Sequence, residues 1–383
     1  MPSPADFAAV LPAITAWRQD FHRHPELGFE EHRTAARVAA LLRGWGIQVT
    51  EGIAGTGVVG TIQGRMQDRL GNRAIALRAD MDALAMTEAT GLPYASQAPG
   101  RMHACGHDGH TAMLLGAAKY LAETRNFKGS VVLVFQPAEE IGGGAKAMIE
   151  DGLFDRFGIG HVYGMHNMPG LATGHIALRP GSIMAASAKF TIRVTGRGGH
   201  AARPHTTIDP IVTALQTIVS RNTDPVTSAV VTVTKFDAGT AYNIIPEIIE
   251  LWGSVRALSM DVAKETEDRI VHIATKIGEA AGASVEVDYN QTIAVTHNDP
   301  DEAAFSTAVA REVVGEAMVD ADVAPVMAGE DFSRMLELRP GTLVFIGNGK
   351  SADLHHPAYD FEDEAIPAGV SYWVRLVERK LAA

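Results

Sequence analysis

The stretch at residues 102–110, M-H-A-C-G-H-D-G-H, concentrates side chains that bind metals or move protons. It holds one thiol, three imidazoles and one carboxylate, and Cys105 is the only cysteine among 383 residues. Cys105 and His107 can face one point because the backbone turns at the intervening glycine, and the N-terminus of a helix predicted to begin near His110 would stabilise a thiolate there. The stretch therefore indicates a metal site or a reactive thiol, although an isolated buried cysteine more often serves only in packing.

Four further segments place metal-ligand residue types after predicted strands or in loops. They have the sequences Q-P-A-E-E, H-N, G-E-D-F and L-H-H-P at residues 136–140, 166–167, 329–332 and 354–357. Adjacent glutamates diverge, so one carboxylate can bind a cation while its neighbour faces the reacting water. A mixture of Cys, His and Glu suits zinc or another late first-row divalent metal. More than four such ligands favour a two-metal site or an open catalytic site over a closed structural one.

An α/β domain is expected to position these segments. Predicted strands alternate with predicted helices, among them residues 110–123 and 145–149, and the strands are residues 56–62, 74–78, 131–135 and 161–165. This alternation is typical of a largely parallel sheet, which binds ligands at the carboxyl ends of its strands. The candidate ligands follow those ends.

A second pattern interrupts the first between residues 182 and 291. Strands and helices follow there in the order β-α-β-β-α-β, with predicted elements at 187–195, 209–221, 229–236, 247–257, 260–281 and 284–289. This order is that of a ferredoxin-like domain. The α/β pattern resumes with elements at 301–315, 343–346 and 363–381. We therefore expect a catalytic domain of residues 1–181 and 292–383 with an inserted domain of residues 182–291.

The overall composition excludes several classes of partner. Acidic residues outnumber basic ones by 45 to 33, for a formal net charge of -12, which disfavours nucleic acid and anionic membranes as partners. No apolar run approaches the roughly 20 residues that span a bilayer. A single cysteine permits no internal disulfide, and no secretory signal follows Met1, so we expect a cytoplasmic protein.

Six motifs together resemble one enzyme family. They are R-A-D-M-D-A-L at 78–84, H-A-C-G-H-D at 103–108, Q-P-A-E-E at 136–140, G-M-H-N at 164–167, G-H-A-A-R-P at 199–204 and L-H-H-P at 354–357. In this order they resemble the amidohydrolase branch of the metal-dependent aminoacylase and carboxypeptidase superfamily. That branch includes hippurate hydrolase, indole-acetyl-amino-acid hydrolases and N-acetyldiaminopimelate deacetylase. The resemblance covers nearly the whole chain and implies a family without fixing a substrate.

The resemblance implies a centre of two divalent metal ions, with zinc, manganese, cobalt and nickel all open as their identity. Its five ligands would be Cys105, His107, Glu140, His166 and His355. Glu139 would be the general base that takes a proton from the attacking water, and Asp82 would orient a ligand from outside the first coordination shell. His356 follows His355 directly, so the sequence leaves two imidazoles competing for the last ligand position.

The inserted domain resembles the family's lid and dimerisation domain. This likeness implies a homodimer in which His200 reaches a neighbouring subunit's site and polarises the scissile carbonyl. Asn243 and Arg256 match positions linked to substrate binding, and an arginine fork suits the α-carboxylate of an N-acylated amino acid. Without the resemblance, Arg256 would be interpreted as a charge on a surface strand.

The implied reaction is hydrolysis of the amide bond of a small N-acyl amino acid or dipeptide, which releases a carboxylic acid and a free amino acid. Benzoyl, acetyl and indole-acetyl groups all remain open as the acyl group. Two other hypotheses stand beside it. Cys105 could be a nucleophile with a histidine base, but such a mechanism leaves Glu139, Glu140 and His355 without a task. A metal- or ligand-binding protein on the same scaffold would bind metal without turnover.

Overall fold

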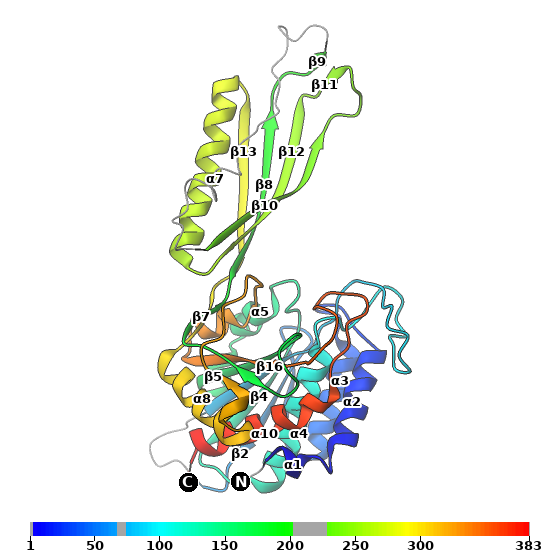
Figure 1. The fold of residues 1–383 in the computed structure, drawn as a ribbon, viewed down its shortest axis with the longest axis vertical. Coiled ribbons are helices and arrows are strands. Elements are labelled where there is room, and N and C mark those ends of the chain that lie inside the picture. The colour runs from blue at the N-terminus through cyan, green and yellow to red at the C-terminus, as the bar shows by residue number, and fades with distance from the viewer. Residues whose placement is uncertain (1–2, 67–73, 202–227, 383) are drawn as a thin grey trace. The chain divides into compact units, whose positions relative to one another are not determined.

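The computed structural model describes residues 3–66, 74–201 and 228–382, which form two compact units (Figure 1). Unit 1 comprises Met1–Ile183, His297–Ala324 and Asp331–Ala383. Unit 2 comprises Met184–Thr296 and Pro325–Glu330. Each unit has its own sheet and its own buried apolar cluster.

Unit 1 is built on an eight-stranded sheet with the order β1-β2-β4-β3-β5-β16-β6-β15. The strands are, in chain order, β1 Gln48–Ile53, β2 Gly57–Gln63, β3 Ala74–Asp80, β4 Ser130–Gln136, β5 Ile159–Met168, β6 Ile176–Ala177, β15 Val319–Asp320 and β16 Gly341–Gly347. The central strands β4, β3, β5 and β16 are parallel, whereas β1, β2 and β6 pair antiparallel. The predicted α/β class with a mostly parallel sheet is confirmed, with antiparallel strands added towards its edges.

The central strands are buried on both faces. All seven residues of β3 and all seven of β4 are buried, in keeping with their nearly continuous apolar sequences. Asp80 ends β3 opposite Gln136, which ends β4. Polar residues thus begin at the carboxyl ends of adjacent parallel strands, where the sequence placed the ligands.

Helices cover this sheet, and α4 is the most deeply buried of those described. The helices of unit 1 are α1 Pro4–Phe7, α2 Leu11–Arg23, α3 His32–Gly44, α4 His107–Thr124, α5 Gly144–Glu150, α6 Leu153–Phe157, α8 Pro300–Val314, α9 Ser333–Leu336 and α10 Ile366–Lys380. Helix α4 contacts β3 as well as α2 and α10, and most of its own residues, many of them small or apolar, are buried. This packing fixes the N-terminus of α4 at the candidate site. No helix in the described ranges is long and apolar enough to cross a membrane.

Unit 2 contains a four-stranded antiparallel sheet with the order β10-β12-β8-β13. Its elements are β8 Ala186–Thr195, β9 Gly199–His200, β10 Ala229–Ala238, β11 Ile244–Ile245, β12 Ile248–Ala257, α7 Met260–Ala281 and β13 Ser284–Ile293. Helix α7 buries one stripe, from Ala263 to Gly278, in contact with the sheet. The separate antiparallel sheet confirms the second part of the predicted fold. The helix predicted at residues 209–221 lies outside the described residues.

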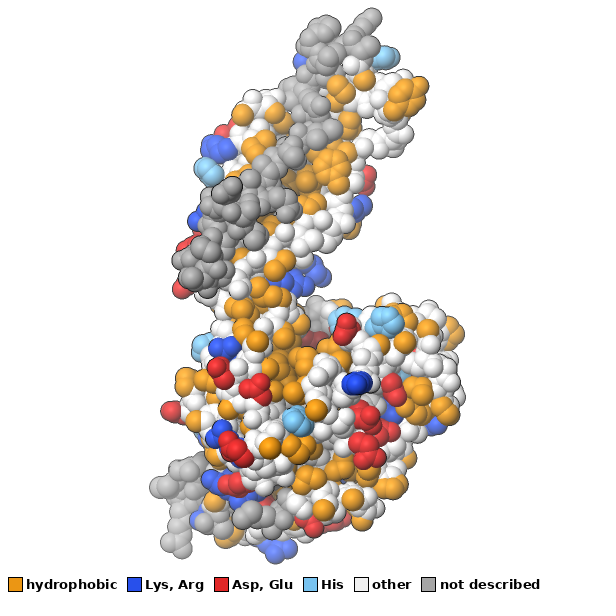
Figure 2. All heavy atoms as spheres, in the orientation of Figure 1, with side chains coloured by type: hydrophobic (Ala, Val, Ile, Leu, Met, Phe, Trp, Pro, Cys, Tyr) orange, Lys and Arg blue, Asp and Glu red, His pale blue; other side chains and the backbone are white. Residues whose placement is uncertain are grey.

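Two small sheets complete the described structure. Strands β9 and β11 pair within unit 2, and β7 Gly181–Met184 pairs with β14 Thr296–Asn298 where the chain passes from one unit to the other. Alternate residues of β12 are buried, and hydrophobic side chains of β10 and β12, namely Val230, Phe236, Ile248 and Trp252, reach the surface of this unit (Figure 2).

Candidate active site

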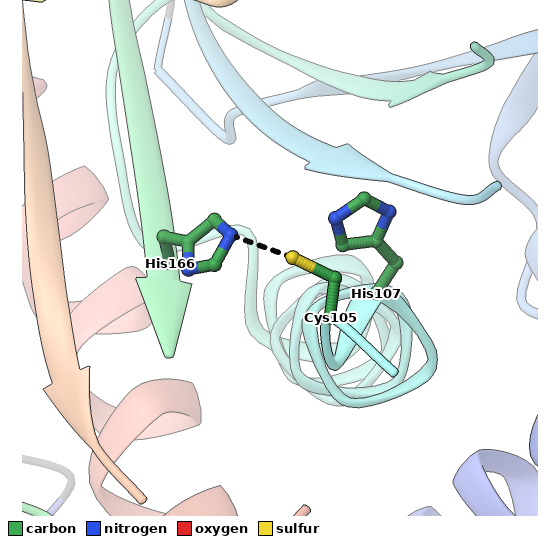
Figure 3. A group of neighbouring side chains, drawn as sticks. All are labelled: Cys105, His107 and His166. Carbon is green, nitrogen blue, oxygen red and sulfur yellow. Dashed lines mark hydrogen bonds between the residues drawn. The ribbon is translucent and has the colours of Figure 1, made fainter. Parts of the chain in front are cut away.

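Cys105, His107 and His166 converge inside unit 1 (Figure 3). Cys105 precedes the N-terminus of α4, His107 is its first residue, and His166 lies near the end of β5. The Cys105 Sγ and His166 Nε2 atoms are 3.5 Å apart. All three side chains are buried. Residues 61 positions apart in the sequence therefore present a thiol and an imidazole to one point.

Gly106 makes this convergence possible. Its φ is +85°, in the left-handed region that favours glycine. A Cβ atom on Gly106 would lie 2.3 Å from Asn167 Nδ2 and 2.5 Å from Tyr359 Oη, so no other residue fits without displacing them. The turn at Gly106 separates Cys105 from His107 and lets both side chains approach the same site.

Asp82 orients two of the candidate ligands at once. His107 Nδ1 donates to the Asp82 carbonyl at 2.9 Å and lies 3.2 Å from its Oδ1. The other carboxylate oxygen, Oδ2, accepts a hydrogen bond from the Glu140 backbone N–H at 2.9 Å. In the neutral ring, the lone pair is then on Nε2, and this buried atom has no hydrogen-bond partner in the described part of the chain. This is the arrangement expected of a carboxylate that supports metal ligands.

Glu139 and Glu140 follow β4 and reach different partners. Ala138, just before them, has a left-handed φ of +54°, which turns the chain sharply at the end of the strand. Glu140 Oε2 lies 3.3 Å from His355 Nε2, while its buried Oε1 has no hydrogen-bond partner among the described residues. Glu139 Oε1 accepts a hydrogen bond from the Asp331 backbone N–H at 3.3 Å. The two carboxylates thus have different polar partners, although one oxygen of each lies within 4.8 Å of the other and of a His107 ring nitrogen.

His166 is held with one ring nitrogen available. Its Nδ1 donates to the Asn167 carbonyl at 2.7 Å, which leaves the Nε2 lone pair facing Cys105. Burial, helped by the nearby His110 ring, lowers the pKa of His166 to about 3, so the ring is neutral at pH 7. A neutral imidazole is the form that binds a metal.

Nearby negative charges raise the pKa of both His107 and Cys105. Burial opposes a charge on His107, but Asp80 and Cys105 raise its pKa well above the usual range. Burial and the Glu140 carboxylate raise the pKa of the Cys105 thiol well above its ordinary value. A divalent cation would reverse both effects, because metal ligands bind in their deprotonated forms and metal binding releases their protons.

His355 rather than His356 is placed with the other ligands. The His355 backbone N–H donates to the Ala104 carbonyl at 2.8 Å. The φ of His355 is +62°, in the left-handed region, so the chain turns at this residue. His356 Nδ1 instead accepts a hydrogen bond from the Ala358 backbone N–H at 3.1 Å. Among the described residues, only His355 of this pair belongs to a group whose ligand atoms lie close enough together to share an ion.

The five predicted ligands form overlapping groups in unit 1. Ligand atoms lie within 4.8 Å of one another in each of three sets, which are Cys105 with His107 and His166, Cys105 with Glu140 and His355, and His107 with both glutamates. The unpartnered His107 and Glu140 atoms, together with the mixed N, O and S donors, fit a transition-metal centre. The geometry therefore brings together every ligand that the sequence proposed.

Several supporting residues were missed at the sequence level. Asp80 Oδ1 accepts a hydrogen bond from His110 Nδ1 at 2.6 Å, and His110 Nε2 accepts one from the Asn167 N–H at 2.9 Å. Asp331, in the G-E-D-F segment whose residue types suit metal binding, uses its carboxylate to accept hydrogen bonds from Arg78 and Gln136. The sequence motifs contain these residues, but only the folded structure shows which partner each one contacts.

His200, Asn243 and Arg256 lie in unit 2. His200 pairs with Ile244 across β9 and β11, and the Ala201 N–H donates to the Asn243 carbonyl at 3.0 Å, so His200 and Asn243 are close neighbours. Arg256 lies on β12, half-buried, where its guanidinium donates to the Val255 carbonyl. Burial lowers the pKa of Arg256 below its usual value.

Comparison with known proteins agrees with the motifs and the geometry. Residues 76–379 match the family model described as peptidase family M20/M25/M40. Hippurate hydrolase of Campylobacter jejuni is 44% identical over 370 residues, which cover 95% of each protein. N-acetyl-L-cysteine deacetylase of Bacillus subtilis is 41% identical over 95% of this chain and 87% of its own length.

A solved structure extends the match to the fold. A dinuclear metal-binding peptidase of the M20 family from Bacillus subtilis superposes with a TM-score of 0.85 at 33% identity, over 97% of this chain and 98% of that one. The predicted resemblance is confirmed, and with it the class of enzyme, a metal-dependent amidohydrolase. The chain belongs to peptidase family M20/M25/M40.

Proposed function

We propose that this protein hydrolyses the amide bond of N-acyl amino acids at a centre of two divalent metal ions. The observation that carries the proposal is the set of overlapping ligand groups that share Cys105, His107 and Glu140, with buried atoms of His107 and Glu140 left without hydrogen-bond partners in the described chain. The substrate class rests on the relatives, since one is named hippurate hydrolase and another N-acetyl-L-cysteine deacetylase.

Five side chains would hold the ions: Cys105, His107, Glu140, His166 and His355. The bound ions would polarise the scissile carbonyl and lower the pKa of a water towards about 7. Zinc, manganese, cobalt and nickel all suit this mixture of nitrogen, oxygen and sulfur donors, and ligand type alone does not choose among them. Thiolate ligation requires reduced Cys105, which fits a cytoplasmic setting.

Glu139 would act as the general base. Its adjacent residue Glu140 would be a ligand, so Glu139 would lie beside the attacking water and accept its proton. The hydrogen bond from the Asp331 N–H to Glu139 Oε1 supports this role, because it restrains the carboxylate. Glu139 would then return the proton to the leaving amine. Asp82 would keep His107 in the tautomer that presents Nε2.

Unit 2 would supply substrate contacts and the dimer interface. We assign it the role of an inserted lid, with residues 182–291 as the expected domain. His200 would polarise the scissile carbonyl in a neighbouring subunit's site, Arg256 would bind the α-carboxylate and Asn243 would bind substrate. Strand β10 lies at the edge of its sheet and exposes Val230 and Phe236, which suits pairing in a homodimer.

A cysteine-nucleophile mechanism fits the site less well. Cys105 and His166 are close enough for such a pair. However, burial and the neighbouring carboxylates both oppose a thiolate, and a nucleophilic cysteine needs a lowered pKa. The convergence of Glu140 and His355 on the same thiol also has no use in that mechanism.

The test is release of free amino acid from a panel of N-acyl amino acids, led by N-benzoylglycine and N-acetylcysteine. Metal-stripped protein is assayed before and after addition of manganese, cobalt or zinc. Turnover that appears only with metal supports the proposal and ranks the acyl groups. Turnover unaffected by stripping would overturn it in favour of Cys105 as a nucleophile, and metal uptake without turnover on any substrate would favour a binding protein.

A further inference from the structure

All the polar groups of Asn167, in its backbone and its side chain, form hydrogen bonds close to the candidate ligands Cys105 and His166. Its carbonyl accepts a hydrogen bond from His166 Nδ1 at 2.7 Å, and its Nδ2 donates to the Cys105 carbonyl at 2.5 Å. Its backbone N–H donates to His110 Nε2 at 2.9 Å, and its Oδ1 accepts from Tyr359 Oη at 2.7 Å. One buried residue thus connects the end of β5 to the turn before α4.

The orientation of the Asn167 amide follows from its partners. The Cys105 carbonyl can only accept a hydrogen bond, so the NH₂ group of Asn167 must face it. The amide oxygen then faces Tyr359, whose hydroxyl must be the donor. Tyr359 is fully buried, and burial, with the charge of Asp108, raises its pKa well above the usual value, so the hydroxyl keeps its proton.

The same pair packs directly against the ligand-bearing turn. A Cβ on Gly106 would collide with both Asn167 Nδ2 and Tyr359 Oη, so these atoms lie beside the turn that separates Cys105 from His107. Tyr359 also follows His355 by four residues in the same loop. A shift of this pair would therefore move the turn, and with it the thiol.

We infer that Asn167 and Tyr359 are positioning residues of the metal centre, which set the Cys105 thiol at the correct place relative to His166. The inference rests on the proposed function, because it assumes that both side chains bind metal. Neither Asn167 nor Tyr359 offers a ligand atom in any described group, so their effect on the ions would act through Cys105 and His166. Groups that orient ligands in this way typically change metal affinity by about 10- to 100-fold when removed.

The test is a cobalt(II) titration of metal-free Tyr359→Phe protein. Binding is monitored through the near-ultraviolet absorption band that a thiolate gives when it binds cobalt. The variant keeps the ring but loses the hydrogen bond that fixes the Asn167 amide. We expect cobalt affinity to fall about 10-fold or more and the thiolate band to weaken per bound ion. Unchanged affinity with an unchanged band would overturn the inference.

Tyr163→Phe is the matched control. Tyr163 is also fully buried in unit 1, and its hydroxyl donates to Glu302 at 2.6 Å, so this variant loses one buried hydrogen bond away from the ligands. It should lose a similar amount of stability in the metal-free protein while cobalt affinity and the band stay at wild-type values. Equal effects on cobalt binding in both variants would reduce Tyr359 to a general structural role and so overturn the inference.

The same titration separates this inference from the proposed function. Wild-type protein without any thiolate-to-cobalt band would contradict Cys105 as a ligand and thus the proposed centre itself. A normal wild-type band with no change in Tyr359→Phe would overturn only the positioning role. A further variant, Asn167→Asp, replaces the donor to the Cys105 carbonyl by a carboxylate oxygen, and it should weaken the band as well.

Discussion

His107 Nε2 and Glu140 Oε1 lie 3.9 Å apart, and neither buried atom has a hydrogen-bond partner within the described chain. Buried polar atoms are normally paired, and an unpaired one costs about 1 to 3 kcal/mol. A shared cation would satisfy both atoms together.

Chelation should lower the thermal stability of the protein. An ion that binds only the folded state stabilises it by about 2.7 kcal/mol at a concentration of 100 times its Kd, and removal leaves carboxylates repelling one another. Calorimetric melting of protein with and without a chelator measures this difference. Identical melting temperatures, with metal content verified in each sample, would contradict metal binding at this cluster.

Glu139→Gln should lower kcat by about 100- to 10,000-fold while cobalt affinity stays close to that of the wild type. Glutamine keeps an oxygen that can accept the hydrogen bond from the Asp331 N–H, so the local structure is retained, but it cannot take up a proton. Steady-state kinetics and a metal titration on the same sample measure the two quantities. Glu150→Gln, at an exposed position on α5, is the matched control and should change neither. An active Glu139→Gln enzyme would refute the assigned base.

Gly106→Ala should abolish tight metal binding and destabilise the protein. The added methyl group would collide with Asn167 and Tyr359, and alanine at a φ of +85° is strained in addition. Gly46→Ala separates the two effects, because Gly46 has a φ of +71° and open space around its missing Cβ. We expect the control to lose only about 1 kcal/mol and to bind metal normally. Denaturant unfolding measures the loss of stability in each variant. Equal losses in the free energy of unfolding for Gly106→Ala and Gly46→Ala would show that the surrounding residues shift to relieve the collision.

His22→Gln should destabilise the protein near pH 6, and its effect should fade in alkaline solution. Burial opposes a charge on His22, but Asp108 at 2.8 Å raises its pKa to about 9, with further help from Glu88, while Arg18 opposes it. Because the pKa is higher in the folded state, protonated His22 contributes its full stabilisation at a pH below the unfolded pKa of about 6.5. That contribution is lost as the pH rises through the folded pKa of about 9. Breaking a buried pair costs about 3 kcal/mol.

Urea unfolding of wild type and His22→Gln at pH 6, 8 and 10 measures this dependence. The difference in the free energy of unfolding should be largest at pH 6 and smallest at pH 10. The exposed His272 on α7 provides a matched control, since His272→Gln removes an imidazole without breaking a buried ion pair and should give only a small difference. A constant difference for His22→Gln would show that its charge plays no part in stability.

The long elements could be predicted from the sequence, and the short ones could not. Helix α7 has the predicted bounds because its apolar stripe repeats over six turns, and β3 and β4 were recognised from continuous apolar runs. Strands β6 and β15 have two residues each, too few to show any period. Antiparallel β1 was missed because its residues are mostly exposed or half-buried.

The ligand types were evident from their motifs, whereas the residues that orient them were not. Cys105 and His107 occupy one short motif, but Tyr359 is 192 residues from the asparagine that it contacts. Nothing in the sequence around a tyrosine four residues before the last predicted helix indicates such a partner, because the contact exists only after α4, β5 and the late loop have packed. Side-chain networks of this kind depend on tertiary structure rather than on spacing.

The single carboxylate of Asp82 has a thermodynamic consequence. One oxygen restrains the ring of His107 and the other restrains the backbone of Glu140, so these two side chains cannot reorganise independently. Their conformational entropy is therefore lost when the chain folds rather than when an ion arrives. Such a preorganised template is expected to exchange ions without unfolding, in contrast to small zinc domains that fold only around their metal.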